Sequence, residues 1–294
     1  MHADALFLKN KMIITKLKGG LGNQMFQYAF GKRMAIQNND ILKLDIAGLQ
    51  QTSTETKRDY ALGAFAIDAE IAGHGETTRI KYPYGLLSKV ARFIHAKVFR
   101  KFYVQYDHSI TTQTGDLYLD GFFQDQRYFK DIEGTIRKEF ILKEQMSEPA
   151  RKVAEKIAAS ENSASIHIRR GDYVTDAKAN AHHGTCGPEY YAEAFKVLRN
   201  KVGPCTFFVF SDDIDWVKEN MNLENATYVS SPEIRDYEEL ILMSLCSHNV
   251  IANSSFSWWG AWLNANPEKI VIAPHRWTAK SSNNDIIPSS WIKI

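Results

Sequence analysis

The 294-residue sequence lacks the features that would place it in several specialised classes of protein. Its 36 basic and 34 acidic residues give a net charge of only +2, which leaves no electrostatic footprint for nucleic acid. Its three cysteines, Cys186, Cys205 and Cys246, are too few and too scattered for a disulfide framework, so we expect reduced thiols in the cytoplasm. No apolar run approaches the roughly 20 residues that cross a bilayer, although peripheral association with a membrane surface stays open.

The second half of the sequence alternates between strand-like and helix-like segments. Short apolar runs typical of strands lie at residues 163–168, 206–210, 226–230, 249–252 and 269–273. Pro188 suits the first turn of a helix, and Asp236 with Glu239 forms a D-x-x-E capping signature for another. Continuous apolar strands between helices indicate a parallel sheet that is covered on both faces.

The first half has a second strand–helix–strand pattern and a less regular part. The pattern predicts a strand over 12–18, a glycine-rich turn, a helix over 24–37 and a strand over 41–46. Residues 64–73 and 86–103 look helical, the latter with a basic side. We place the division between two domains, 1–150 and 151–294, in the polar helical stretch that surrounds residue 150.

Polar groups gather where the predicted strands of the second half end. These ends read HIRRGDY, SDD, SSPE, NSS and PHRW, and each offers charged or hydrogen-bonding side chains. In an open parallel α/β sheet, ligands bind beyond the carboxyl ends of the strands. The set of strand ends together is therefore stronger evidence for a binding site than any one of its motifs.

The HIRRGDY segment predicts a site for a diphosphate. Strand alternation places His167 and Arg169 on one face of the sheet and Arg170 on the other. A guanidinium group at a strand end can make two charge-assisted hydrogen bonds to a phosphate. For Arg170, a structural salt bridge with Asp172 is the competing interpretation.

The NSS segment predicts a second phosphate-binding element. It follows a strand and begins a helix, so the free N–H groups of the first helical turn point to the ligand edge of the sheet. Ser254 and Ser255 fit a phosphate there, and this role is compatible with simple N-capping. We expect Trp258, Trp259 and Trp262, later in the same helix, mainly to pack in the core.

The SDD segment offers a carboxylate that can accept hydrogen bonds from the edge of a guanine or from ribose hydroxyls. A metal site is a third interpretation, but the adjacent Asp212 and Asp213 point in different directions. His182, His183 and Cys186 also lack a fourth ligand. We therefore predict no metal site.

The GGLGNQ segment resembles a dinucleotide fingerprint only in part. Met25 stands where the third glycine of G-x-G-x-x-G would be, so a nicotinamide-dependent oxidoreductase is disfavoured. The amides of Asn23 and Gln24, next to Gly22, suit a ligand rich in hydroxyl groups, such as a sugar.

Four segments, GGLGNQMFQYAFG, HIRRGDYV, FSDD and ANSSFSWWGAWL, together resemble the bacterial α-1,2-fucosyltransferases of glycosyltransferase family 11. The motifs run from residue 19 to about residue 276. The resemblance implies an α/β fold of the GT-B type, with two Rossmann-like domains facing across a cleft. Residues 1–150 would form the acceptor-side domain, and residues 151–294 would bind GDP-fucose.

The same resemblance implies a galactoside 2-α-L-fucosyltransferase. Such an enzyme transfers L-fucose from GDP-β-L-fucose, with inversion, to the 2-hydroxyl of a terminal galactoside, here of a lipopolysaccharide O-antigen glycan. GDP-fucose is a substrate, and neither a cofactor nor a metal ion is implied. A non-catalytic sugar- or nucleotide-binding protein on the same scaffold is the alternative.

The resemblance also implies roles for individual residues. Arg169 would hold the β-phosphate together with Ser254 and Ser255, and Asp212 would bind guanine, with His167 beside it. Arg170 and Phe256 complete the expected donor site. Asn23 would lie near the acceptor hydroxyl, flanked by Gly22 and Gln24. Asp172, Asp176 and Asn23 are candidates for the catalytic base, and the sequence does not choose among them.

Overall fold

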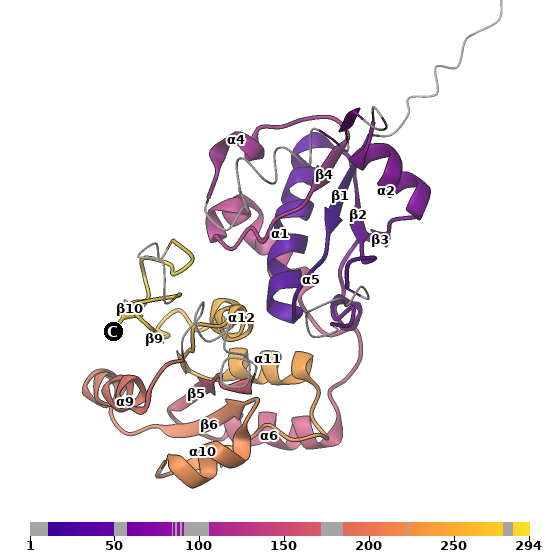
Figure 1. The fold of residues 1–294 in the computed structure, drawn as a ribbon. Helices are drawn as coiled ribbons and strands as arrows, with labels where there is room; N and C mark the ends of the chain where they lie inside the picture. The colour runs from indigo at the N-terminus through magenta and orange to yellow at the C-terminus, as the bar shows by residue number, and fades with distance from the viewer. Residues whose placement is uncertain are drawn as a thin grey trace, which may run out of the picture. The chain divides into compact units, whose positions relative to one another are not determined.

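The computed structural model describes residues 11–49, 58–83, 85, 87–88, 90, 106–171, 185–221, 223–278 and 285–294. The chain divides into two compact units, Met1–Ile141 and Leu142–Ile294, each built on one sheet (Figure 1). The division that we expected after residue 150 falls within α6 (Glu148–Ala158), which belongs to the second unit.

The first unit has a parallel sheet with the strand order β3-β2-β1-β4. Its strands are β1 (Met12–Lys16), β2 (Ile41–Asp45), β3 (Glu70–Ile71) and β4 (Leu117–Leu119). Its helices are α1 (Leu21–Asn38), α2 (His74–Lys81), α4 (His108–Thr111) and α5 (Glu133–Glu139), with 3-10 turns η1 (Leu62–Ala64), η2 (Gln126–Tyr128) and η3 (Lys130–Ile132).

The strand–helix–strand pattern at the start of the chain is confirmed by β1, α1 and β2. The helix that we expected over residues 64–73 is wrong, because this stretch contains the end of η1 and then β3, which pairs in parallel with β2. Most of the helix expected over 86–103 lies outside the described residues.

The second unit has a parallel sheet with the strand order β10-β9-β8-β5-β6-β7. Its strands are β5 (Ser163–Ile168), β6 (Thr206–Ser211), β7 (Ala226–Tyr228), β8 (His248–Val250), β9 (Val271–Ala273) and β10 (Ile292–Lys293). Its helices besides α6 are α9 (Pro188–Val202), α10 (Ile214–Asn220), α11 (Asp236–Leu245) and α12 (Ser255–Leu263). All five predicted strands and the helix that begins at Pro188 are confirmed.

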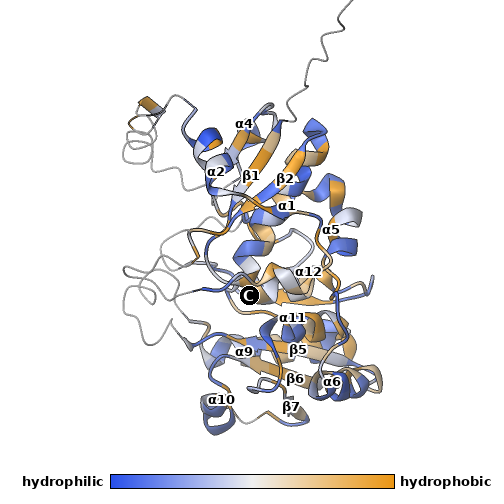
Figure 2. Ribbon diagram, turned by 90° about the vertical axis from the view of Figure 1, so that its right-hand side faces the viewer, coloured by the Kyte–Doolittle hydropathy of each residue, from blue (hydrophilic) through white to orange (hydrophobic). Residues whose placement is uncertain are grey.

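Both faces of this second sheet are covered, as predicted. Ile166 and Ile168 of β5 pack with α9 and α10, whereas Phe208 and Phe210 of β6 pack with α6 and α11. In Figure 2, β6 is mainly orange, which reflects its continuous apolar run. The alternation fixes which side chains at the strand ends share a face of the sheet.

The start of α11 differs from the capping pattern that we predicted. Its N-cap residue is Arg235, and the carboxylate of Glu238 accepts a hydrogen bond from the Arg235 N–H at 2.9 Å. Asp236 is the first helical residue, so the predicted pairing of Asp236 with Glu239 is wrong. Glu239 therefore does not cap the N-terminus of α11.

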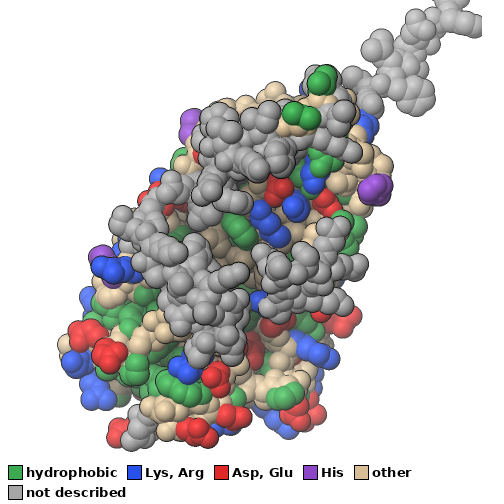
Figure 3. All heavy atoms as spheres, in the orientation of Figure 1, with side chains coloured by type: hydrophobic (Ala, Val, Ile, Leu, Met, Phe, Trp, Pro, Cys, Tyr) green, Lys and Arg blue, Asp and Glu red, His purple; other side chains and the backbone are tan. Residues whose placement is uncertain are grey.

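No helix within the described residues is long and apolar enough to cross a membrane. On the face drawn in Figure 3, basic and acidic side chains are interspersed. This distribution agrees with the small net charge of the sequence.

Candidate active site

The strand order of the second unit creates a ligand-binding edge at β5. The chain runs from β5 to β6 and β7 on one side, and later returns through β8 and β9 on the other. The carboxyl ends of β5 and β8 therefore flank a topological switch point, where open α/β sheets bind their ligands. The loops after β5, β6 and β8 hold most of the donor-site residues that we predicted.

Arg169, directly after β5, is held by Asp212, directly after β6. Its Nη1 atom lies 2.9 Å from Oδ2 of Asp212, and the other carboxylate oxygen accepts the backbone N–H of Arg170 at 2.8 Å. Both oxygens of Asp212 are thus engaged by the loop after β5. These two contacts give Asp212 a structural role in the loop after β5, and its predicted role in binding guanine stays a prediction.

Gly171 makes this arrangement possible. A Cβ atom at position 171 would lie 2.2 Å from Oδ2 of Asp212, which is far inside contact distance. Any larger residue there would displace the carboxylate that holds Arg169. The glycine of the HIRRGDY motif is therefore needed for the close approach of the two strand-end loops.

Arg170 lies on the opposite face of the sheet, as strand alternation predicted. Its Nε atom is 3.2 Å from Asp213, and its guanidinium carbon is 3.4 Å from the centre of the Trp216 ring. Arg170 thus has a structural ion-pair partner in Asp213, whereas the pairing with Asp172 that we considered lies outside the described residues. Arg170 therefore fastens the loop after β5 to α10 rather than offering an unpaired charge to a donor.

His167 is a neutral, buried residue beneath the predicted phosphate site. Burial, assisted by the charge of Arg169, lowers the pKa of His167 to about 3. Its Nδ1 atom lies 2.9 Å from the hydroxyl of Ser257 in α12, and its ring centre is 5.6 Å from that of Phe256. His167 thus ties β5 to the first turn of α12, and Phe256 packs beside it.

The N-terminus of α12 follows β8 and forms the second part of the site. Ser254 is the N-cap residue, and its hydroxyl accepts the Phe256 N–H at 3.3 Å. Ser255 begins the helix. The capping role that we considered for Ser254 is confirmed, and the helix presents its first-turn N–H groups at the edge where Arg169 lies.

Sequence reasoning missed Glu239, which lies in α11 near the ends of β6 and β7. Burial raises the pKa of Glu239 to about 7; a hydrogen bond from Ser230 opposes this shift, and the charges of Asp236 and Asp212 add to it. A carboxyl group with so perturbed a pKa is typical of a functional site. The capping motif to which we assigned Glu239 concealed this possibility.

In the first unit, the glycine-rich loop links β1 to α1. Gly19 has φ of +78°, a left-handed conformation that favours glycine, and Gly20 is the N-cap residue. Gly22 is buried in the first turn of the helix. The loop therefore turns sharply at the carboxyl end of β1, between β2 and β4.

Gln24 has a structural role in place of the acceptor contact that we expected. Its side chain is fully buried, its Nε2 atom donates to the carbonyl oxygens of Gly19 and Asp59, and its Oε1 atom accepts the Ala61 N–H. These three backbone groups use the amide, so Gln24 has nothing left for a sugar hydroxyl.

Asn23, in contrast, lies at the switch point of the first sheet. Its Oδ1 atom accepts a hydrogen bond of 2.7 Å from Gln124, in the loop after β4. This loop is held by the buried Phe123, which has φ of +51° and packs 4.6 Å from the ring of Phe30. Such a conformation in a bulky residue is costly and is typical of functional loops.

A charged cluster completes the edge of the first sheet. Asp120 follows β4, and its carboxylate lies 3.1 Å from Lys18 and 3.4 Å from Lys16. Burial alone would raise the pKa of Asp120, but the two ammonium groups outweigh it and hold that pKa below its usual value. Sequence reasoning missed this cluster because its members come from separate segments of the chain.

The remaining predicted residues are not placed. Asp172, Asp176, His182 and His183 lie outside the described residues. Within the parts of the chain that are described, no group of three or more His, Cys, Asp or Glu side chains could hold a metal ion.

Comparison with known proteins assigns the family. The model of glycosyl transferase family 11 matches residues 92–294. An alpha-1,2-colitosyltransferase of Escherichia coli is 33% identical to the chain, in an alignment that covers 96% of the chain and 99% of the relative. The chain belongs to glycosyltransferase family 11. A second relative, the O-antigen biosynthesis glycosyltransferase WbnK of Escherichia coli, is 30% identical over 95% of the chain and 99% of its own length.

More distant relatives agree with this assignment. A galactoside alpha-(1,2)-fucosyltransferase 1 of Saimiri boliviensis boliviensis is 24% identical over half of this family 11 chain and 43% of its own length. Among solved structures, the fucosyltransferase NodZ from Bradyrhizobium covers 86% of the chain and 93% of its own, with a TM-score of 0.54 and 11% identity. The expected GT-B type of fold, with two parallel-sheet α/β domains, is confirmed.

Proposed function

We propose that this family 11 glycosyltransferase transfers L-fucose from GDP-β-L-fucose, with inversion, to the 2-hydroxyl of a terminal galactoside. The main support is the placement of Arg169, directly after β5, and of the N-terminus of α12, which follows β8, at the switch point between these two adjacent strands. A guanidinium and a set of free helical N–H groups suit a diphosphate leaving group. Two of the relatives named above are an alpha-1,2-colitosyltransferase and a galactoside alpha-(1,2)-fucosyltransferase, which favours an α-1,2 linkage here.

The donor site lies in the second unit in this proposal. The diphosphate contacts Arg169, Ser254 and Ser255. The base extends toward β6 and β7, where Glu239 accepts hydrogen bonds from the N1–H and amino groups of guanine. Asp212 is assigned to holding Arg169 in place, since its two oxygens contact the Arg169 guanidinium and the Arg170 N–H.

The acceptor site lies in the first unit in this proposal. Asn23 and Gln124 offer amide groups to a galactoside, and Asp120 accepts a hydrogen bond from a sugar hydroxyl at the same edge of the sheet. A glycan of the O-antigen type is the preferred acceptor, because one relative is named for O-antigen biosynthesis.

The reaction is a displacement at the anomeric carbon. The acceptor hydroxyl attacks from the face opposite GDP, the bond from the anomeric carbon to the β-phosphate oxygen breaks, and GDP leaves with the electron pair. Arg169 and the α12 N–H groups stabilise the negative charge that develops on GDP. The hydroxyl proton passes to a carboxylate, for which Asp172 and Asp176 stay candidates. We propose that no metal ion or cofactor takes part.

The decisive experiment measures GDP release from GDP-fucose with and without a β-galactoside, followed by NMR of the product. The 2-deoxy-galactoside is the matched acceptor control, and GDP-colitose is the matched donor. Release that requires the 2-hydroxyl and yields an α-1,2-fucoside supports the proposal. Transfer of colitose in preference to fucose would correct the donor, and GDP binding without any transfer would identify a non-catalytic binder.

A further inference from the structure

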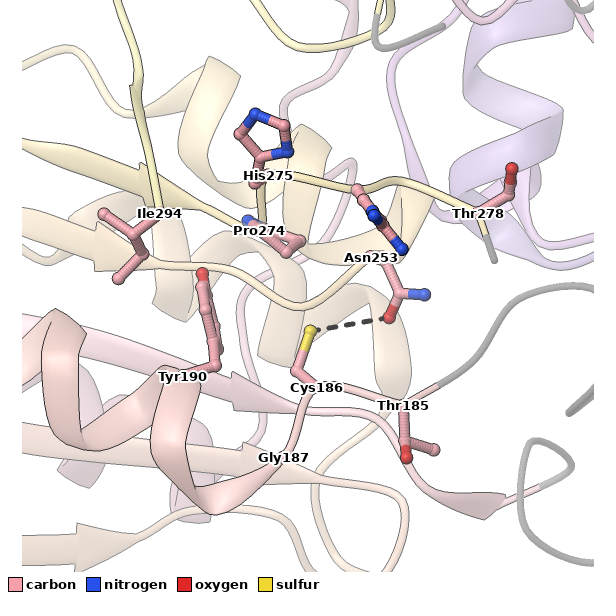
Figure 4. A pocket seen from close by; sticks show the side chains of 10 residues that line it. Thr185, Cys186, Gly187, Tyr190, Asn253, Pro274, His275, Thr278 and Ile294 are labelled. Carbon is pink, nitrogen blue, oxygen red and sulfur yellow. Dashed lines mark hydrogen bonds between the residues drawn. The ribbon is translucent and has the colours of Figure 1, made fainter. Parts of the chain in front are cut away.

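A cavity of about 380 Å³ lies in the second unit, beyond the carboxyl ends of β8 and β9. Figure 4 shows it from close by. Residues from four parts of the chain line it, among them Cys186, Tyr190, Asn253, His275, Arg276 and Ile294. None of these belongs to the phosphate site described above, so the cavity needs its own explanation.

Two hydrogen bonds place this cavity directly beside the phosphate-binding turn. Asn253 immediately precedes Ser254, the N-cap residue of α12. Its Nδ2 atom donates to the carbonyl oxygen of Trp277 at 3.4 Å, and its Oδ1 atom lies 3.7 Å from the thiol of Cys186, as Figure 4 shows. Asn253 therefore links the turn before α12 to the loop after β9, which contains Arg276.

The charges at the phosphate site are already balanced within the protein. Arg169 pairs with Asp212 and Arg170 pairs with Asp213, so these four side chains have no net charge. A nucleoside diphosphate sugar has two negative charges on its phosphates, and more charge develops on GDP as it departs. Partial charges at the N-terminus of α12 help, but a full positive charge without a partner would help more.

Among the described residues, Arg276 carries such a charge. Its side chain is exposed and lines the cavity, and no carboxylate in the described part of the chain makes an ion pair with it. The neighbouring groups do not compensate it, because burial raises the pKa of Cys186 to about 11 and keeps its thiol neutral. An arginine at a cavity wall without an acidic partner is suited to bind an anion.

We propose that this cavity receives the β-phosphate end of the donor, and that Arg276 supplies a positive charge that stabilises the departing GDP. The inference rests on the proposed function and adds a catalytic residue to it. The donor then extends along the edge of the sheet, with its base near β6 and β7, its α-phosphate at β5 and its β-phosphate between the ends of β8 and β9.

Calorimetry with GDP and GMP tests this inference, because GMP lacks the β-phosphate. Replacing Arg276 with glutamine should weaken GDP binding by about 10- to 100-fold, as for a lost charge-assisted contact. GMP binding should change less than about threefold, and kcat should fall along with GDP affinity. Arg276→Lys, which keeps the charge, should recover part of both losses.

Arg199→Gln is the matched control, since Arg199 is an exposed arginine of α9 in the same unit. It should leave binding, kcat and melting temperature unchanged. Equal GDP affinity and kcat in wild type and both Arg276 variants would overturn the inference and leave the proposed function intact. A raised acceptor KM with unchanged GDP affinity would also overturn it, and would assign Arg276 to an anionic acceptor. A wild-type protein that binds no GDP would overturn the proposed function itself.

Discussion

Replacing Asp212 with asparagine separates the two roles that a carboxylate after β6 can have. If Asp212 holds Arg169, the change should impair catalysis and leave the preference for guanine intact. If Asp212 binds guanine, as the sequence suggested, the same change should reduce that preference. An asparagine can offer one carbonyl oxygen, so it can replace only one of the two bonds that Asp212 accepts from Arg169 and from the Arg170 N–H.

The size of the effect follows from the exposure of the pair. A hydrogen bond to a charged group contributes about 1.5–3 kcal/mol. The side chains of Arg169 and Asp212 are 23% and 24% exposed, so solvent screens part of this interaction, and we expect a loss of about 1–2 kcal/mol. If the loss applies fully to the transition state, kcat falls by roughly 5- to 30-fold.

The assay compares the dissociation constants of GDP and ADP, beside kcat and a melting curve. Asp213→Asn is the matched control, because it makes the same chemical change one residue away, at a carboxylate that holds Arg170. We expect the ADP-to-GDP ratio of dissociation constants to be the same in wild type and both variants. A ratio that drops by tenfold or more only in Asp212→Asn would refute the positioning role and restore Asp212 as the guanine ligand.

Three further predictions follow from the proposed function and from the first unit. Since burial raises the pKa of Glu239 to about 7, its carboxylate form dominates only above that pH. The affinity for GDP-fucose, whose phosphates do not titrate in this range, should therefore rise between pH 6 and pH 8. Glu239→Gln should abolish this rise. Gln24→Leu leaves the backbone groups of Gly19, Asp59 and Ala61 without their hydrogen bonds. The free energy of unfolding, measured in urea, should therefore fall by roughly 3 kcal/mol. A loss below about 1 kcal/mol would contradict the structural role of Gln24. Transfer should continue in EDTA, whereas recovery only on adding Mg²⁺ or Mn²⁺ would argue for a metal.

The architecture of the second unit could be predicted because its strands are short, apolar and separated by clear helix signals. Pro188 marked the start of α9, and the run over 163–168 became a fully buried strand. The first unit was harder to predict. The stretch 64–73 has helix-like apolar spacing, but its actual state depends on the pairing of two residues, Glu70 and Ile71, with β2. Pairing between distant segments overrides local propensity.

The partners of the charged groups could not be predicted from the sequence. The arginines after β5 and the aspartates after β6 were found at the correct strand ends, but the sequence could not show that they pair with each other. Glu238 and Glu239 are neighbours in one helix, yet one caps the backbone and the other has a pKa near 7. Such differences arise from contacts with distant parts of the chain, which the local sequence does not show.

The same limit applies to the amides of the glycine-rich loop. Asn23 and Gln24 are chemically alike and adjacent, and both suit a sugar when considered alone. The return of residues 58–61 over the loop buries Gln24 and uses its amide, whereas Asn23 faces Gln124 at the edge of the sheet. A long-range segment thus separates two roles that the sequence alone could not distinguish.

The helix that begins with the phosphate-binding serines also forms part of the hydrophobic core. Trp258 and Trp259 are fully buried, and their rings pack against each other and against Trp262. Directed evolution of donor preference therefore has little freedom in α12, because most replacements there would cost folding stability as well as binding. Libraries should instead vary His275, whose exposed side chain lines the cavity and can change while the scaffold beneath it stays intact.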